Sequence, residues 1–187
     1  MTKTQQTSPL VESSIISGVY TVPLRGHADD RGRFTEVFRK EWFHWVNFDR
    51  LQSNHSESRA NVLRGLHYHL RQIDYWHVTS GMIRVGLADL RPSSPTYRAV
   101  TTLDIGENNR HGLFIPEGVA HGFVALTDVS LIYYVNQYYD GGSDENGVAW
   151  NDPDLNVQWG VDQPLLSPRD ANNPLLKDIP AHKLPQG

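Results

Sequence analysis

Short segments rich in β-branched and aromatic residues alternate with turn residues along most of this chain, without any long helical periodicity. Glycine, proline, asparagine and aspartate separate the segments, as is typical of strands joined by tight turns. From Gly18 onward the segments read VYTVPL, RFTEVF, NVLRGLHYHL, YWHVTSG, MIRVGLADLR, YRAVTTLDI, GLFIPEGVAHGFVALT and SLIYYVNQYYD. Many short strands without long helices favour a sandwich or a jelly roll, and a β-barrel of this size usually has an interior mouth for a ligand.

The two ends of the chain differ from this β-rich middle. Residues 1–14 are polar and predict an arm that is disordered or lies on a partner. One segment before the C-terminal region, KEWFHWV at 40–46, has a helical pattern, and it is barely two turns long. The region 150–187 carries six of the eleven prolines, which predicts loops and short helices packed on the body. At this length we expect a single domain, 1–187.

Charge, cysteine content and hydropathy exclude several classes of function. The net charge is −4 and lysine and arginine form no run, so we expect no nucleic-acid partner. The chain has no cysteine, which removes disulfides, thiolate catalysis and thiolate metal sites. No stretch approaches 18 apolar residues, so no membrane span is expected. The polar start lacks the apolar core of a signal peptide, and we expect a cytoplasmic protein.

The segment GLHYHLRQIDYWHVTSG (65–81) places several polar side chains close together. His67 and His69 are two residues apart and would project from the same face of a strand. With Asp74 they form the pattern H-x-H-x4-D-x6-G, and His121 later follows a Pro-x-Gly turn. This spacing resembles the two motifs of the cupin superfamily, in which two histidines, a glutamate and a later histidine bind one metal inside a β-barrel.

The cupin resemblance implies a divalent metal held by His67, His69, Asp74 and His121. Three imidazoles and a carboxylate suit Fe(II), Mn(II), Ni(II), Zn(II) or Cu(II). Aspartate replaces the usual glutamate, and Ala125 stands where the second motif usually has asparagine. A plain alternative is that His69 is a polar side chain in a wet cleft, because nine histidines make a chance pair unsurprising.

A longer series of segments resembles a narrower family, the dTDP-4-dehydrorhamnose 3,5-epimerases. The matching segments, in order, are DRGRFTEVF (30–38), QSNHSESRANVLRGLHYHL (52–70), ADLRPSSPTY (88–97), LFIPEGVAHGFVALTD (113–128), YYVNQYYD (133–140), WNDPDLNVQW (150–159) and LLSPRDANNPLL (165–176). Their number and order make the resemblance specific. It implies an all-β, cupin-type double-stranded jelly-roll barrel with short peripheral helices. It also implies a homodimer, for which the N-terminal arm is a candidate swapped element.

The resemblance further implies an isomerase of deoxysugar biosynthesis. Its substrate would be a dTDP-4-keto-6-deoxy-hexose, epimerised at C3, C5 or both through an enolate and without a cofactor. The matching positions make His67 the base, Asp170 the carboxylate that orients it, and Tyr133 the acid on the opposite face of the sugar. The positions matching nucleotide, diphosphate or sugar contacts are Arg31, Phe34, Gln52, Asn54, Arg64, His121 and Tyr139. Without the resemblance, Tyr133 and Tyr139 would read as ordinary aromatic residues of a β-core.

One position contradicts the usual mechanism of that family. Where the family reads Gln-x-Lys, this chain has Gln72-Ile73-Asp74, and His69 replaces a glutamine. The lysine ammonium would stabilise the enolate oxygen. Two unit charges about 4 Å apart at an effective dielectric of about 20 interact by about 4 kcal/mol, so losing the lysine could cost on the order of 10³ in rate.

Three outcomes follow from this substitution. In the first, Asp74 points away or pairs with Arg71 or His77, and the chain remains an epimerase. In the second, the metal set is occupied and the chain is a metal-dependent isomerase, lyase or oxygenase, with His67 consumed as a ligand. In the third, the chain binds a sugar nucleotide without catalysis.

Overall fold

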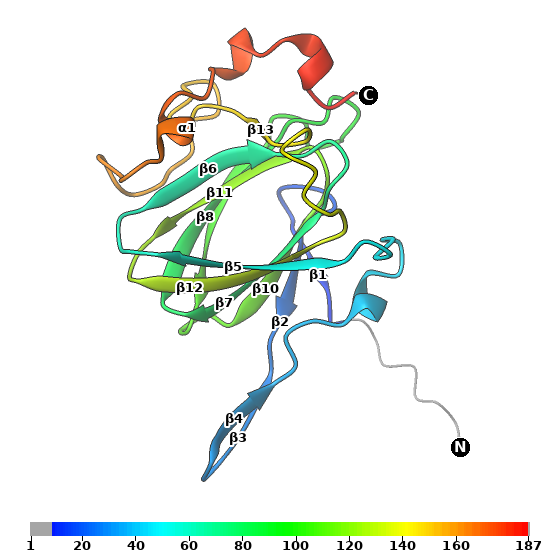
Figure 1. Cartoon of the computed structure of the whole chain (residues 1–187), viewed down its shortest axis with the longest axis vertical. Helices are drawn as coiled ribbons and strands as arrows, with labels where there is room; N and C mark the ends of the chain where they lie inside the picture. The colour runs from blue at the N-terminus through cyan, green and yellow to red at the C-terminus, as the bar shows by residue number, and fades with distance from the viewer. Residues whose placement is uncertain (1–8, 187) are drawn as a thin grey trace.

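The computed structural model describes residues 9–186, which form two facing β-sheets with a hairpin extending from one end (Figure 1). The six-stranded sheet has the order β1 (Val11–Glu12), β2 (Tyr20–Pro23), β10 (His111–Ile115), β7 (Asp74–Ser80), β12 (Val129–Val135), β5 (Gln52–Ser58). The five-stranded sheet has the order β13 (Asn146–Gly147), β6 (Leu63–Tyr68), β11 (Val119–Ala125), β8 (Met82–Asp89), β9 (Val100–Gly106). Neighbouring strands are antiparallel, and the predicted all-β jelly roll is confirmed.

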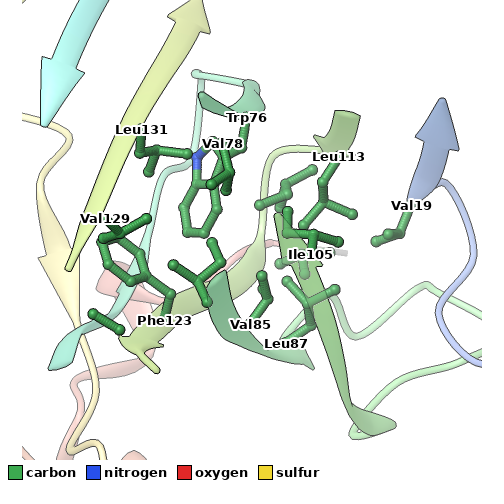
Figure 2. Packing of buried hydrophobic residues seen from close by; sticks show 14 of the residues in the cluster. Val19, Trp76, Val78, Val85, Leu87, Ile105, Leu113, Phe123, Val129 and Leu131 are labelled. Atoms are coloured by element: carbon green, nitrogen blue, oxygen red, sulfur yellow. The ribbon is translucent and has the colours of Figure 1, made fainter. Parts of the chain in front are cut away.

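The main core lies between the two sheets (Figure 2). In β7 the side chains alternate, so that Trp76 and Val78 enter this core while Tyr75 packs on the other face. Phe123 of the five-stranded sheet contacts the Trp76 ring edge-on at a centroid separation of 5.7 Å. Leu131 of β12 completes this part of the core.

The C-terminal region covers the outer face of the five-stranded sheet. Its short helices are α1 (Pro168–Ala171), η2 (Leu176–Asp178) and η3 (Ala181–Lys183). Trp159 and Leu176 pack there against Leu66 and Val124, and β11 is buried on both faces. Buried Asp152 holds the segment, because its carboxylate accepts a 2.7 Å hydrogen bond from the backbone N–H of Leu176. Within residues 9–186, no helix is long and apolar enough to cross a membrane.

The N-terminal arm differs in part from its prediction. Residues 1–8 lie outside the described residues. Val11–Glu12 form the edge strand β1 on the six-stranded sheet of the same chain. Glu12 also accepts a 2.8 Å hydrogen bond from the N–H of Gly18, which fixes the turn that follows. The candidate helix at 40–46 forms the single 3₁₀ turn η1 (Lys40–Phe43), whose Phe43 is fully buried among aromatic rings.

Strands β3 (Gly26–Asp29) and β4 (Gly32–Thr35) form a hairpin that projects away from both sheets (Figure 1). All four residues of β3 are exposed. Phe34 of β4 is 73% exposed, which is unusual for a phenylalanine in a folded chain. The Arg31 side chain at the tip is 90% exposed and is bonded only locally, to Asp29 at 2.6 Å. The hairpin therefore presents a cation and an aromatic ring to the surroundings.

A buried carboxylate fixes the loop after β8. Asp89 is completely buried and accepts hydrogen bonds from Arg91 Nε at 2.8 Å, Ser94 Oγ at 2.6 Å and Thr96 Oγ1 at 2.8 Å. Burial raises the pKa of Asp89, but these hydrogen bonds outweigh it and the pKa falls below its usual value. Arg91 also donates to the carbonyl of Ser17 at 2.6 Å. One carboxylate thus connects the loop to the N-terminal segment.

Candidate functional site

A pocket of about 220 Å³ opens between the two sheets and is lined by six of the twelve predicted site residues. The lining residues are Ser56, Arg64, His67, His69, Gln72, Asp74, Trp76, His121, Gly122, Phe123, Leu131, Tyr133, Glu145 and Arg169. A larger hollow of about 680 Å³ lies beside the hairpin, and none of the predicted site residues lines it. We therefore take the smaller pocket, where titratable groups converge, as the candidate site.

Two strands of the five-stranded sheet approach closely at the pocket wall. His67 of β6 lies opposite His121 of β11, and the register shifts between His121 and Phe123. A Cβ on Gly122 would lie 2.6 Å from the carbonyl oxygen of Arg64, so only glycine permits this approach. Because Gly122 has no side chain, β6 and β11 can approach each other, and His67 and His121 lie on one wall of the pocket.

His67 and Asp170 are 103 residues apart and form a short hydrogen bond. His67 Nε2–H donates to Asp170 Oδ1 at 2.6 Å. Asp170 lies in α1, where Ser167 caps the helix by accepting from the Asp170 N–H at 3.1 Å. Burial raises the pKa of Asp170, but the hydrogen bond and charge of His67 and the Ser167 bond outweigh it, and the pKa lies below its usual value. With its proton on Nε2, neutral His67 carries its lone pair on Nδ1.

His69 and His121 are held in the other tautomer. His69 Nδ1–H donates to the carbonyl of Asp144 at 2.8 Å, and His121 Nδ1–H donates to the carbonyl of Val119 at 2.9 Å. Nε2 of His69 then lies 3.7 Å from Asp74 Oδ2, and Nε2 of His121 lies 3.9 Å from the same oxygen. Burial is the largest influence on His121 and lowers its pKa to about 4, despite the negative charge of Asp74. His121 is therefore a neutral imidazole at neutral pH.

Asp74 points into the pocket and is 3% exposed. The indole N–H of Trp76 donates to its Oδ1 at 3.2 Å, and Gln72 Nε2 donates to its Oδ2 at 3.3 Å. Arg71 instead donates to Ser143 Oγ at 2.8 Å and is largely exposed. The carboxylate therefore occupies the pocket itself.

Tyr133 enters the pocket from β12, in the sheet opposite His67. Burial raises the pKa of its phenol most strongly, and the negative charges of Asp74 and Glu145 raise it further against the opposing effect of Arg64. Tyr133 therefore keeps its proton at neutral pH and is an O–H donor facing the space between the sheets.

The remaining predicted residues lie at the rim or outside the pocket. Arg64 lines it and is held by Ser58 Oγ, which accepts from its Nε at 2.9 Å. Gln52 donates to Asn54 at 2.8 Å and accepts from the backbone N–H of Tyr139 at 3.1 Å, so the three form one cluster. Tyr139 lines an adjacent hollow that shares Gln72 and Glu145 with the pocket. The hairpin residues Arg31 and Phe34 line neither space.

The four-residue metal set predicted from the sequence is only partly assembled. The ligand atoms of His69, Asp74 and His121 lie within 4.8 Å of one another, and His67 is not in this group. Its Nε2 is instead committed to Asp170. His67 therefore forms a dyad with Asp170, while His69, Asp74 and His121 form a triad in the same pocket.

Sequence reasoning missed two charged residues of the pocket. Arg169 Nη1 lies 3.2 Å from Glu145 Oε2, and both side chains line the cavity. Arg169 directly precedes Asp170, so the segment SPRD already contained it. Ser56 shares a face of β5 with Asn54 and could have been found from the two-residue period of a strand. Nothing local pointed to Glu145, because it reaches the pocket from a loop.

The family model of dTDP-4-dehydrorhamnose 3,5-epimerase matches residues 13–178. A relative of that name from Shigella flexneri is 37% identical over 151 residues, covering 77% of this chain and 83% of the relative. Among solved structures, the dTDP-6-deoxy-D-glucose-3,5-epimerase of Legionella pneumophila Philadelphia 1, in complex with dTDP-4-keto-L-rhamnose, superposes with a TM-score of 0.87 at 30% identity, covering 95% of this chain and 97% of that one. A 3′-monoepimerase of Streptomyces bikiniensis in complex with dTDP-quinovose gives 0.82 at 31% identity, covering 89% and 88%.

Proposed function

The chain belongs to the dTDP-4-dehydrorhamnose 3,5-epimerase family, and from that membership we propose how its own residues perform the reaction. The enzyme is an isomerase that epimerises a dTDP-linked keto-deoxysugar. We assign a dTDP-4-keto-6-deoxy-hexose as the substrate, His67 as the base and Tyr133 as the acid. The observation that carries this assignment is the 2.6 Å bond from His67 to buried Asp170 on one wall, facing Tyr133 on the other.

The reaction needs one base and one acid on opposite faces of the sugar. The C4 ketone acidifies the C–H bonds at C3 and C5. His67 Nδ1 takes the proton, and the electron pair of the broken C–H bond moves onto the ketone oxygen to form an enolate. Tyr133 then gives its proton to the same carbon from the other face, which inverts it. The negative charge of Asp170 stabilises the imidazolium that forms on His67.

Tyr133→Phe tests this division of labour. The variant is expected to lower epimerisation by about 10²–10⁴-fold, because inversion needs the acid. The base is still present, so the substrate C–H hydrogen should continue to exchange with D₂O. Mass spectrometry and proton NMR of dTDP-4-keto-6-deoxyglucose measure exchange and inversion in one sample. An equal loss of both would rule out Tyr133 as the acid, and dTDP binding by the wild type without any exchange would indicate a non-catalytic binder.

The exposed hairpin supports a homodimer in which each copy completes the other's site. Arg31 and Phe34 are assigned to the nucleotide, yet they are exposed and do not line the pocket of their own chain. The hairpin that carries them projects away from both sheets (Figure 1). An arginine fork suits a diphosphate, and a phenyl ring suits a base. We assign these contacts to the pocket of a second copy. The swapped element is then the hairpin, because the described end of the N-terminal arm pairs with its own sheet.

Mixing two inactive variants tests this arrangement. One is His67→Asn and the other is Arg31→Ala/Phe34→Ala, which is expected to weaken dTDP binding by about 10- to 100-fold. In a mixed dimer one pocket combines intact His67 with an intact hairpin from the other copy. After subunit exchange, assayed below KM, activity should return to about a quarter of the wild-type value. If mixing restores nothing while the dimers do exchange, the hairpin serves its own chain.

A further inference from the structure

We propose that His69, Asp74 and His121 bind a divalent transition-metal ion beside the base His67. The role of this ion rests on the proposed function: it holds positive charge against the enolate oxygen. The site itself rests only on the arrangement of the three side chains. The ion and the base then work in the same pocket, each with its own set of residues.

The three candidate ligand atoms already converge. All lie within 4.8 Å of one another, and Asp74 Oδ2 is 3.7 Å and 3.9 Å from the Nε2 atoms of His69 and His121. Ligands about 2.1 Å from a metal lie about 3.0 Å apart at right angles and about 3.4 Å apart in a tetrahedron. The two gaps to Asp74 exceed the tetrahedral spacing by a few tenths of an ångström, and the two imidazole nitrogens, within 4.8 Å of each other, would approach by up to about 1.4 Å. All three side chains are buried, so they sit where such a site excludes bulk water.

Hydrogen bonds outside the triad orient each ligand. Both histidines give their Nδ1–H to a backbone carbonyl, which leaves Nε2 as the free ligand atom. This is the arrangement that metal-binding histidines usually have. The indole of Trp76 donates to Asp74 Oδ1, while Oδ2 faces the two imidazoles and also accepts from Gln72 Nε2 at 3.3 Å. One carboxylate oxygen and two imidazole nitrogens are thereby directed at one point.

The distances do not favour an ordinary ion pair instead. At 3.7 Å and 3.9 Å neither imidazole is within hydrogen-bonding distance of Asp74 Oδ2. Each imidazole bonds a backbone carbonyl through Nδ1, and its Nε2 faces Asp74 Oδ2 without a hydrogen bond between them. A cation at the centre would give the three facing atoms a common partner. Two imidazoles and one carboxylate suit divalent iron, zinc, cobalt or nickel.

This arrangement leaves the base free. His67 Nε2 is bonded to Asp170, so His67 lies outside the triad and keeps Nδ1 for proton transfer. Three protein ligands leave open positions on the metal, one of which suits the sugar ketone oxygen. When His67 takes the proton, the electron pair moves to that oxygen and its charge is balanced by the ion. Positive charge is thus supplied at Asp74, where the resemblance places a lysine.

Metal binding is tested first without substrate or nucleotide. Protein without a polyhistidine tag is stripped with a chelator, dialysed, and titrated with Co²⁺ or Zn²⁺ alone. We expect about one equivalent bound per chain, with visible Co²⁺ absorption typical of nitrogen and oxygen ligands. His69→Ala and Asp74→Ala should weaken binding on the order of 10²-fold or more. His67→Asn and the exposed-residue control His182→Ala should bind as the wild type does.

The stripped protein must first show the same melting curve as the untreated enzyme. If it then binds neither metal at a 100-fold molar excess of ion, the proposal is overturned. Loss of metal in His67→Asn would equally overturn it, because the ion would then use the base. His69→Gln serves as a second ligand variant of similar size, should the alanine variants not fold.

Activity separates this inference from the proposed function. Stripping the metal should lower solvent exchange on the order of 10³-fold, and adding metal should restore it. Asp74→Lys places a cation at the same position and should make exchange insensitive to the chelator. Full exchange by metal-free wild type overturns the catalytic role of the ion and leaves the epimerase intact. Tight metal binding without exchange leaves the metal site intact and overturns the epimerase assignment.

Discussion

Replacing His67 with asparagine is expected to lower epimerisation by about 10²–10⁴-fold, because the variant lacks the base that we propose for the sugar C–H proton. Asparagine is close in size to the imidazole and can still donate a hydrogen bond to Asp170, which now accepts from His67 at 2.6 Å. The buried carboxylate therefore keeps a partner, and the affinity for dTDP should stay near the wild-type value. Steady-state rates from NMR, together with calorimetric titration of dTDP, measure the two quantities separately.

The matched control for this prediction is His182→Ala, at an exposed position of η3 outside the pocket. It should retain the wild-type rate. In His67→Asn, exchange of substrate hydrogens with D₂O should fall together with epimerisation, in contrast to Tyr133→Phe. A variant that inverts the sugar at more than a tenth of the wild-type rate would show that His67 is not the base.

Asp89→Ala is expected to lower the free energy of unfolding by about 3–5 kcal/mol, the range found when a buried charge loses its partner. Asp89 is fully buried and accepts from Arg91, Ser94 and Thr96. Without it, the Arg91 guanidinium and two hydroxyl groups lose their common acceptor. A protein of this kind is stable by about 5–15 kcal/mol, so the change should remove a large part of the total. Urea unfolding followed by tryptophan fluorescence gives the value.

Asp104→Ala is the matched control for the buried carboxylate. Asp104 accepts from Arg84 Nε at 2.8 Å, the same distance as between Arg91 Nε and Asp89. The Arg84 side chain is 31% exposed, however, and the Asp104 side chain is 40% exposed. An exposed pair contributes about 0–1 kcal/mol, so this variant should differ little from the wild type. If both variants lost a similar free energy of unfolding, burial would not be the reason that Asp89 stabilises the fold.

The fold could be predicted because its strands carry a local signal. In β7 the two-residue alternation assigns Trp76 and Val78 to one face and Tyr75 to the other, as the structure has them. The edge strand β1 and the hairpin strand β3 could not be assigned in this way. Their short polar sequences suit a loop equally well, and only pairing with a distant or local partner makes them strands.

The residues of the site could be predicted better than the hydrogen bonds that join them. The spacing of His67 and His69 indicated a shared face, and both line the pocket. Spacing says nothing about which ring nitrogen is engaged, and that choice separates the dyad of His67 from the triad of His69. The bond between His67 and Asp170 spans 103 residues, and only the resemblance to a family indicated it.

The pocket depends on the docking of the two sheets, since its parts are divided between them. His67 belongs to the five-stranded sheet and Tyr133 to the six-stranded one. Their separation is fixed by the core between the layers, where Phe123 and Leu131 pack (Figure 2). Catalytic competence is therefore a property of cooperative tertiary structure. A molten state with both sheets formed but a loosened core would still contain every residue of the site, and it would be inactive.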